Sequence, residues 1–169
     1  MIYNMDFLIS AMVILLLILW HFLGQKRAED LNNRVFLFFA VLGTADVVAE
    51  FFTNYYITSY NSDMENAAVI VTTIFYLLQA LLPVTFIFYI QTLHEQKIIS
   101  AKKMFISGVP TLVLISVILT NPFTEKLFSF DVTAGYVKGP WYLLMYVSAL
   151  GHFAVALLLI LLWRKKLGP

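Results

Sequence analysis

The 169-residue chain contains no cysteine, so disulfide bonds, thiolate metal sites and cysteine nucleophiles are excluded. It is also poor in charge, because Asp, Glu, Lys and Arg make up 12% of its residues, about half the share of an average soluble domain. The formal net charge is +1, without the clustered basic face that phosphate binding needs, which argues against nucleic acid as a partner. Its three histidines have no zinc-site spacing, and we expect no metal or other cofactor.

Motifs of catalysis are also missing. Ser107, Ser116 and Ser148 lie in apolar runs without a Gly-x-Ser-x-Gly elbow, and no glycine-rich phosphate loop occurs. We therefore expect no enzymatic activity from this chain itself.

Long hydrophobic runs, in contrast, are abundant. Hydrophobic residues make up 61% of the chain, and its mean hydropathy is +0.84. Five runs have about the 17–25 residues that cross a bilayer, and the third, which contains Pro83, is long enough to predict a tilt or kink. The sequence predicts an all-α, polytopic membrane bundle forming a single domain over residues 1–169, with helices at about 6–23, 35–52, 67–93, 104–120 and 141–163.

The basic residues predict the orientation of this bundle. Most of them follow the first, third and fifth runs, and cytoplasmic loops carry the excess of Lys and Arg. The N-terminus is therefore expected outside and the C-terminus in the cytoplasm. The residues behind this prediction are Lys26, Arg27, Arg34, Lys97, Lys102, Lys103, Arg164, Lys165 and Lys166.

Two acidic residues, Asp46 and Glu50, lie within the second run. An ionisable group near the bilayer centre costs about 3 kcal/mol on insertion scales, so it persists mainly where it faces a bundle interior or has a function. Residues four apart share one face of a helix. The pair is therefore the best indication of a functional site.

Other polar side chains lie at comparable depth. Asp46 lies about 15 Å into its run, close to the bilayer midplane, and Gln79 and His152 lie near the middle of their own runs. One interpretation is an outward-facing pocket for a cationic or hydrogen-bonding ligand, and a proton relay is another. A third is structural, with a protonated Asp46 hydrogen-bonded to Gln79 or His152. The candidate ligand-binding residues are Asp46, Glu50, Tyr76, Gln79, Trp141 and His152.

The segment 121–140 interleaves aromatic and turn residues, which predicts an extracellular lid or short hairpin. It contains the motifs Asn121-Pro-Phe, Leu127-Phe-x-Phe-Asp and Gly135-Tyr-x-Lys-Gly-Pro. With Asn33-Arg-Val-Phe-Leu-Phe-Phe, Asp46 and Tyr76-Leu-Leu-Gln-Ala-Leu-Leu-Pro, these motifs resemble the N-terminal membrane sensor of bacterial diguanylate cyclases with GGDEF output domains. The chain is also similar to the seven-helix sensor of membrane histidine kinases.

The resemblance implies a signal-input module in the bacterial cytoplasmic membrane. Its expected partners are membrane lipid, a small-molecule or peptide ligand, a cytoplasmic output domain in cis and a second copy in a homodimer. The output would be a diguanylate cyclase or histidine kinase, preceded by further helices beyond residue 169. Two alternatives stay open from the residues alone, a small proton-coupled carrier and a ligand-free structural subunit.

Overall fold

The computed structural model describes residues 5–24, 30–95, 101–131 and 133–163. Within these ranges the chain forms five long helices, each with a stretch apolar enough to cross a membrane, and this confirms the predicted multi-pass helical fold. The elements are α1 (Met5–Gly24), α2 (Leu31–Thr58), the short 3-10 helix η1 (Ser62–Met64), α3 (Glu65–Glu95), α4 (Ala101–Thr124), β1 (Phe128–Asp131), β2 (Gly135–Lys138) and α5 (Leu143–Trp163).

The second and fourth helices extend further than the sequence predicts. Asp30 caps the start of α2, where its Oδ1 accepts a hydrogen bond of 2.8 Å from the Asn33 N–H. Helix α4 continues through Pro122 and ends at Thr124, and the next residue, Glu125, has a φ of 53° in the left-handed region. The predicted limits followed the apolar runs alone, whereas polar residues continue both helices.

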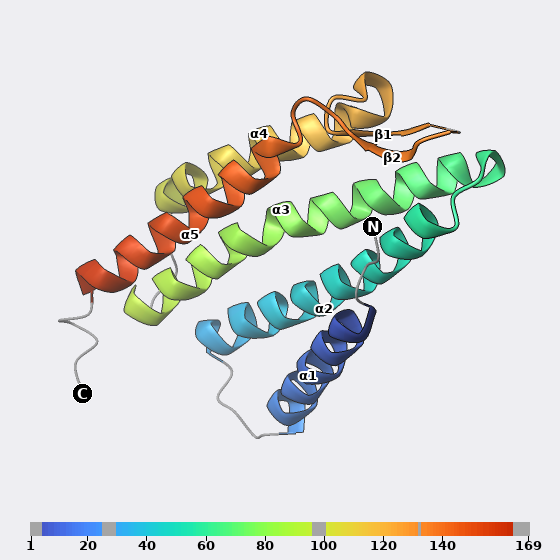
Figure 1. The fold of residues 1–169 in the computed structure, drawn as a ribbon. Helices are drawn as coiled ribbons and strands as arrows, with labels where there is room; N and C mark the ends of the chain where they lie inside the picture. The colour runs from blue at the N-terminus through green and yellow to red at the C-terminus, as the bar shows by residue number, and fades with distance from the viewer. Residues whose placement is uncertain (1–4, 25–29, 96–100, 132, 164–169) are drawn as a thin grey trace.

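Successive helices run in alternate directions, so that the α2–α3 connection and the β-hairpin lie at the same end of the molecule (Figure 1). We call this the hairpin end. Most of the basic residues that predict the membrane orientation lie outside the described ranges, and the orientation stays a prediction. These residues are Lys26, Arg27, Lys97, Arg164, Lys165 and Lys166.

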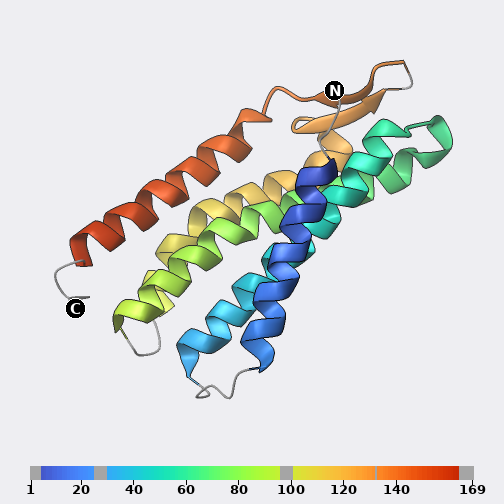
Figure 2. The same ribbon diagram turned by 60° about the horizontal axis from the view of Figure 1, so that its bottom comes forward.

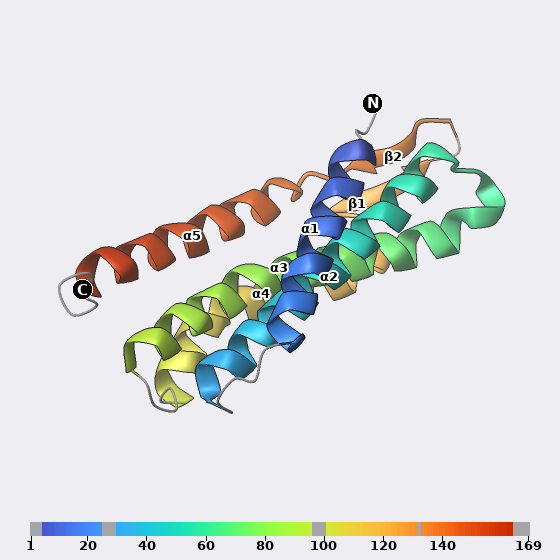
Figure 3. The same ribbon diagram turned by 90° about the horizontal axis from the view of Figure 1, so that it is seen from below.

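Helix α3 is the central element of the bundle. It packs against α2 on one side and against α4 and α5 on the other, while α1 packs on α2. Helices α1 and α5 consequently lie on opposite sides of the molecule (Figures 2 and 3). This order places the polar face of α2 towards α3.

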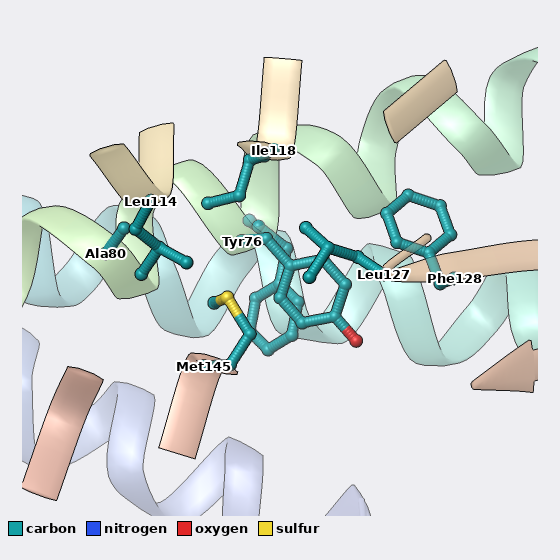
Figure 4. Packing of buried hydrophobic residues seen from close by; sticks show 9 residues of the cluster. Tyr76, Ala80, Leu114, Ile118, Leu127, Phe128 and Met145 are labelled. Atoms are coloured by element: carbon teal, nitrogen blue, oxygen red, sulfur yellow. The ribbon is translucent and has the colours of Figure 1, made fainter. Parts of the chain in front are cut away.

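The main hydrophobic core lies at the hairpin end. Tyr76 and Ala80 of α3 pack there with residues of α4, the hairpin and α5 (Figure 4). The other buried members include Leu114, Ile118, Leu127, Phe128 and Met145. A smaller cluster of Ile87, Ile90 and Ala156 lies further along α3 and α5. The hairpin is therefore part of the folded core.

The short hairpin expected in the segment 121–140 is present, with Phe128 paired to Lys138 in an antiparallel register. Buried Asn121 holds its base, because its Oδ1 accepts a hydrogen bond of 2.7 Å from the Leu127 N–H and its Nδ2 donates one of 2.9 Å to the Phe128 carbonyl. Gly139 lies so close to this base that an added Cβ would be 2.2 Å from the Lys126 carbonyl oxygen. Only glycine permits this approach without a shift of the backbone.

Candidate ligand-binding site

A cavity of about 650 Å³ lies over α3, with residues of α2 and α5 along its sides and β2 at the hairpin end. This volume is within the range of about 300–1,000 Å³ that is typical of small-molecule sites. Four predicted site residues line it, namely Asp46, Glu50, Tyr76 and Gln79. The structure therefore brings together the two carboxylates, the glutamine and the tyrosine at one site.

Aromatic contacts fix the register of the helices around the cavity. The Phe39 and Phe86 ring centroids lie 5.8 Å apart and pair α2 with α3 at that level. Because the two helices are antiparallel, moving seven residues along each from this pair places Asp46 opposite Gln79. The predicted common depth of Asp46 and Gln79 therefore agrees with the helix register.

Asp46 is 9% exposed, and its Oδ1 atom has no hydrogen-bond partner among the described residues. Glu50 is half-buried one turn further towards the hairpin end. The structural interpretation requires a hydrogen bond from Asp46 to Gln79 or His152. The Asp46 Oδ1 makes no such bond. The buried Asp46 Oδ1 therefore has an unmet hydrogen-bonding capacity in a residue that lines the cavity.

Two further polar groups of α2 continue the same face. Thr53 and Asn54 are 3% and 2% exposed, and both line the cavity. The Thr53 hydroxyl and the Asn54 Nδ2 have no hydrogen-bond partner in the described part of the chain. The sequence analysis missed Asn54, because the helix was expected to end at residue 52. The i, i+4, i+8 spacing from Asp46 is the signal that identifies it.

Tyrosines surround the cavity at the hairpin end. The Tyr76 and Tyr136 hydroxyls hydrogen-bond to each other across α3 and β2. The hydroxyls of Tyr142 and Tyr146 are 3.1 Å apart, and the Lys138 Nζ lies 4.4 Å from the Tyr142 ring centroid. Lys138 and all four tyrosines line the cavity. Apart from Tyr76, these groups were not among the predicted site residues, because their convergence depends on how the hairpin folds.

His152 does not line the cavity, contrary to its predicted role as a ligand-binding residue. The Phe86 and Phe153 ring centroids are 6.2 Å apart, which places His152 near the level of Phe86, about 10 Å along α3 from Gln79. Its Nδ1 lies 2.7 Å from the Ser148 carbonyl and its Nε2 lies 3.0 Å from the Thr111 hydroxyl. Since a carbonyl can only accept, Nδ1 carries a proton, and in the neutral ring Nε2 then accepts from the Thr111 hydroxyl. His152 therefore joins α5 to α4.

Trp141 also lies outside the cavity lining and is 47% exposed. It precedes α5, and its backbone N–H donates a hydrogen bond of 2.8 Å to the Lys126 carbonyl. This position suits an interfacial anchor at the membrane surface. Its exposed ring and its place outside the lining do not support the predicted ligand contact.

No cluster of three side chains suited to a metal ion occurs among the residues that the structure describes. Comparison with known proteins gives no match, whether to protein-family models, curated proteins or solved structures.

Proposed function

We propose that this protein is a signal-input module of the bacterial cytoplasmic membrane. It binds a small extracytoplasmic or membrane-borne ligand in the cavity and regulates a cytoplasmic output domain in cis, with cyclic-di-GMP synthesis as the output. One observation carries the proposal, namely a cavity of about 650 Å³ lined by residues with buried polar atoms that have no hydrogen-bond partner in the described part of the chain. The similarity of the sequence motifs to diguanylate cyclase sensors supports the choice of output.

The polar wall gives a physical reason for ligand binding. A buried polar group that lacks a hydrogen bond costs about 1–3 kcal/mol. Asp46, Thr53 and Asn54 each present such an atom on one face of α2. A ligand that hydrogen-bonds to these atoms recovers part of the cost, so binding stabilises the arrangement of helices that surrounds it.

The connection of the hairpin to α5 provides a route for the signal. The cavity is lined by β2 at one end and by α5 along one side, and only residues 139–142 separate these elements. A ligand that favours one position of the hairpin therefore also biases α5 relative to α3. In the predicted orientation, α5 ends at the cytoplasmic face.

The carrier alternative has less support. Transporters commonly bind their substrates where membrane helices are broken. Helix α3 continues through Pro83 beside the cavity, and α4 continues through Pro110.

Thermal unfolding of the purified protein in detergent tests the binding function. A set of small metabolites is screened against the parent and Asp46→Asn, with Asp63→Asn as the matched control because Asp63 is exposed and outside the cavity lining. We expect at least one compound to raise the Tm of the parent and the control, with an apparent Kd at least tenfold weaker for Asp46→Asn. A screen without any hit, or equal responses of all three proteins, would refute the proposal.

A second measurement tests the output. In a protein that carries this chain together with the proposed output domain, the compound identified by the screen should change the rate of cyclic-di-GMP synthesis, and Asp46→Asn should reduce that response. Binding without any change in this rate would support the proposed binding function and contradict the proposed signalling output.

A further inference from the structure

The cavity is elongated rather than round. Its lining residues extend from Phe75 to Phe86 on α3 and from Tyr142 to Phe153 on α5, which is about 16 Å along each helix. A volume of about 650 Å³ over that length corresponds to a mean cross-section of about 40 Å². We infer that the ligand is a single-chain amphiphile of the bilayer with an uncharged, hydroxylated head. This inference rests on the proposed binding function and specifies the ligand class for the same site.

The cavity is open on the side away from α3. Helices α2 and α5 each pack on α3, with little direct contact between them in the described part of the chain (Figure 2). Among the lining residues, Tyr76 and Ala80 of α3 are 5% and 4% exposed, whereas Tyr146 and Phe153 of α5 are 52% and 57% exposed. The cavity is therefore a groove with α3 as its floor, and its open side lies between α2 and α5.

This open side reaches the hydrocarbon layer. Helix α5 has 21 residues and is apolar enough to cross a membrane, and Phe153 is its middle residue. The middle of a spanning helix of this length lies near the bilayer midplane. A membrane-borne ligand can therefore enter the groove sideways, between α2 and α5.

The polarity of the groove matches that of a lipid in the leaflet at the hairpin end. Phe39, Phe86 and Phe153 line the end near the midplane, with 5.8 Å between the first two ring centroids and 6.2 Å between the last two. These rings form a contact surface for an aliphatic tail. The charged lining residues all lie nearer the hairpin, and they are Asp46, Glu50 and Lys138. An amphiphile with its tail on the rings has its head at that end.

The charges at this end favour an uncharged head. A cationic head would lie near Lys138 and an anionic head near Asp46 and Glu50, so either ion meets a group of its own sign. A hydroxyl group both donates and accepts hydrogen bonds. Several hydroxyls on one head can therefore pair with the acids, with the lysine and with the phenols of Tyr142 and Tyr146, which also line the cavity.

Thermal unfolding in nanodiscs of a diacyl phosphatidylcholine tests this inference, because no detergent then competes for the groove. The probe is 1-O-dodecylglycerol, and its half-saturation is measured as the mole fraction in the bilayer that gives half of the Tm increase. Dodecylammonium and dodecanoate test the head, 1-O-butylglycerol tests the tail, and all four compounds also join the metabolite screen. We expect 1-O-dodecylglycerol to reach half-saturation at a mole fraction at least tenfold lower than any of the other three.

Two pairs of variants locate the binding site. Ala149→Phe fills the groove from α5 and should raise the half-saturation of 1-O-dodecylglycerol at least tenfold, whereas Ala154→Phe should not, because Ala154 is exposed and outside the lining. Phe153→Ala removes one ring of the tail region and should also raise it. Phe38→Ala is the control for this second variant, since Phe38 is 58% exposed and does not line the cavity.

The outcomes separate the inference from the proposed function. A probe that acts equally on each variant and its control acts on the bilayer, and the inference is then wrong. Equal half-saturation of 1-O-butylglycerol would overturn the tail, and equal half-saturation of either charged probe would overturn the head. If no amphiphile raises the Tm while a metabolite gives a response that depends on Asp46, the ligand class is wrong and the binding function stands. If no compound of either kind binds, both are wrong.

Discussion

Replacement of Asn121 by alanine should detach the hairpin from the core. The side chain is 1% exposed, and its two strongest hydrogen bonds are 2.7 Å and 2.9 Å long. Truncation leaves the Leu127 N–H and the Phe128 carbonyl without their side-chain partner. At about 1–3 kcal/mol for each buried group, the expected loss is about 2–6 kcal/mol in the free energy of unfolding.

The measurement is unfolding of the purified protein by SDS in mixed micelles, followed by tryptophan fluorescence. Ser116→Ala is the matched control, because Ser116 is exposed and its hydroxyl donates to the Leu112 carbonyl within its own helix. This control should change the free energy of unfolding by less than about 0.5 kcal/mol. If Asn121→Ala loses no more stability than Ser116→Ala, the hairpin does not depend on the Asn121 side chain.

Three further variants test other contacts. Thr111→Val leaves Nε2 of buried His152 without its donor and should cost about 1–3 kcal/mol in the same SDS assay, while a loss equal to that of the Ser116 control would contradict this link. Gly139→Ala should increase proteolysis of the hairpin, since its Cβ would overlap a backbone carbonyl; an unchanged cleavage rate would show that the backbone adapts without strain. The turn donors Thr133 and Ala134 hold the pKa of Asp131 below its ordinary value, so the ionised carboxylate stabilises the hairpin above the ordinary carboxyl pKa, and this contribution is lost as pH falls through the lowered value. Thr133→Val should raise that pKa in an NMR titration, and an unchanged pKa would refute the role of the hydroxyl.

The sequence predicts the helices and part of the site for clear physical reasons. Asp46, Glu50 and Gln79 could be assigned to one region because helical rise and bilayer thickness determine their depth. His152 was placed at the wrong level because depth counted within one run ignores the register between helices, which the ring contacts determine. The sequence analysis missed Lys138 because its position at the cavity depends on how the hairpin folds. Short-range periodicity does not predict that fold.

The unequal lengths of the helices have a consequence for access to the cavity. Helices α2 and α3 contain 28 and 31 residues, which correspond to about 42 Å and 46 Å, whereas the hydrocarbon layer is about 30 Å thick. An average tilt of about 20° shortens their span by only a few ångströms, so both helices must extend into the lipid headgroup layer or the water beyond it. Their additional length relative to α1 and α5 is at the hairpin end (Figure 1). The tyrosine-lined end of the cavity is thereby raised towards the headgroups, so a charged solute that reaches this end would not have to cross the hydrocarbon.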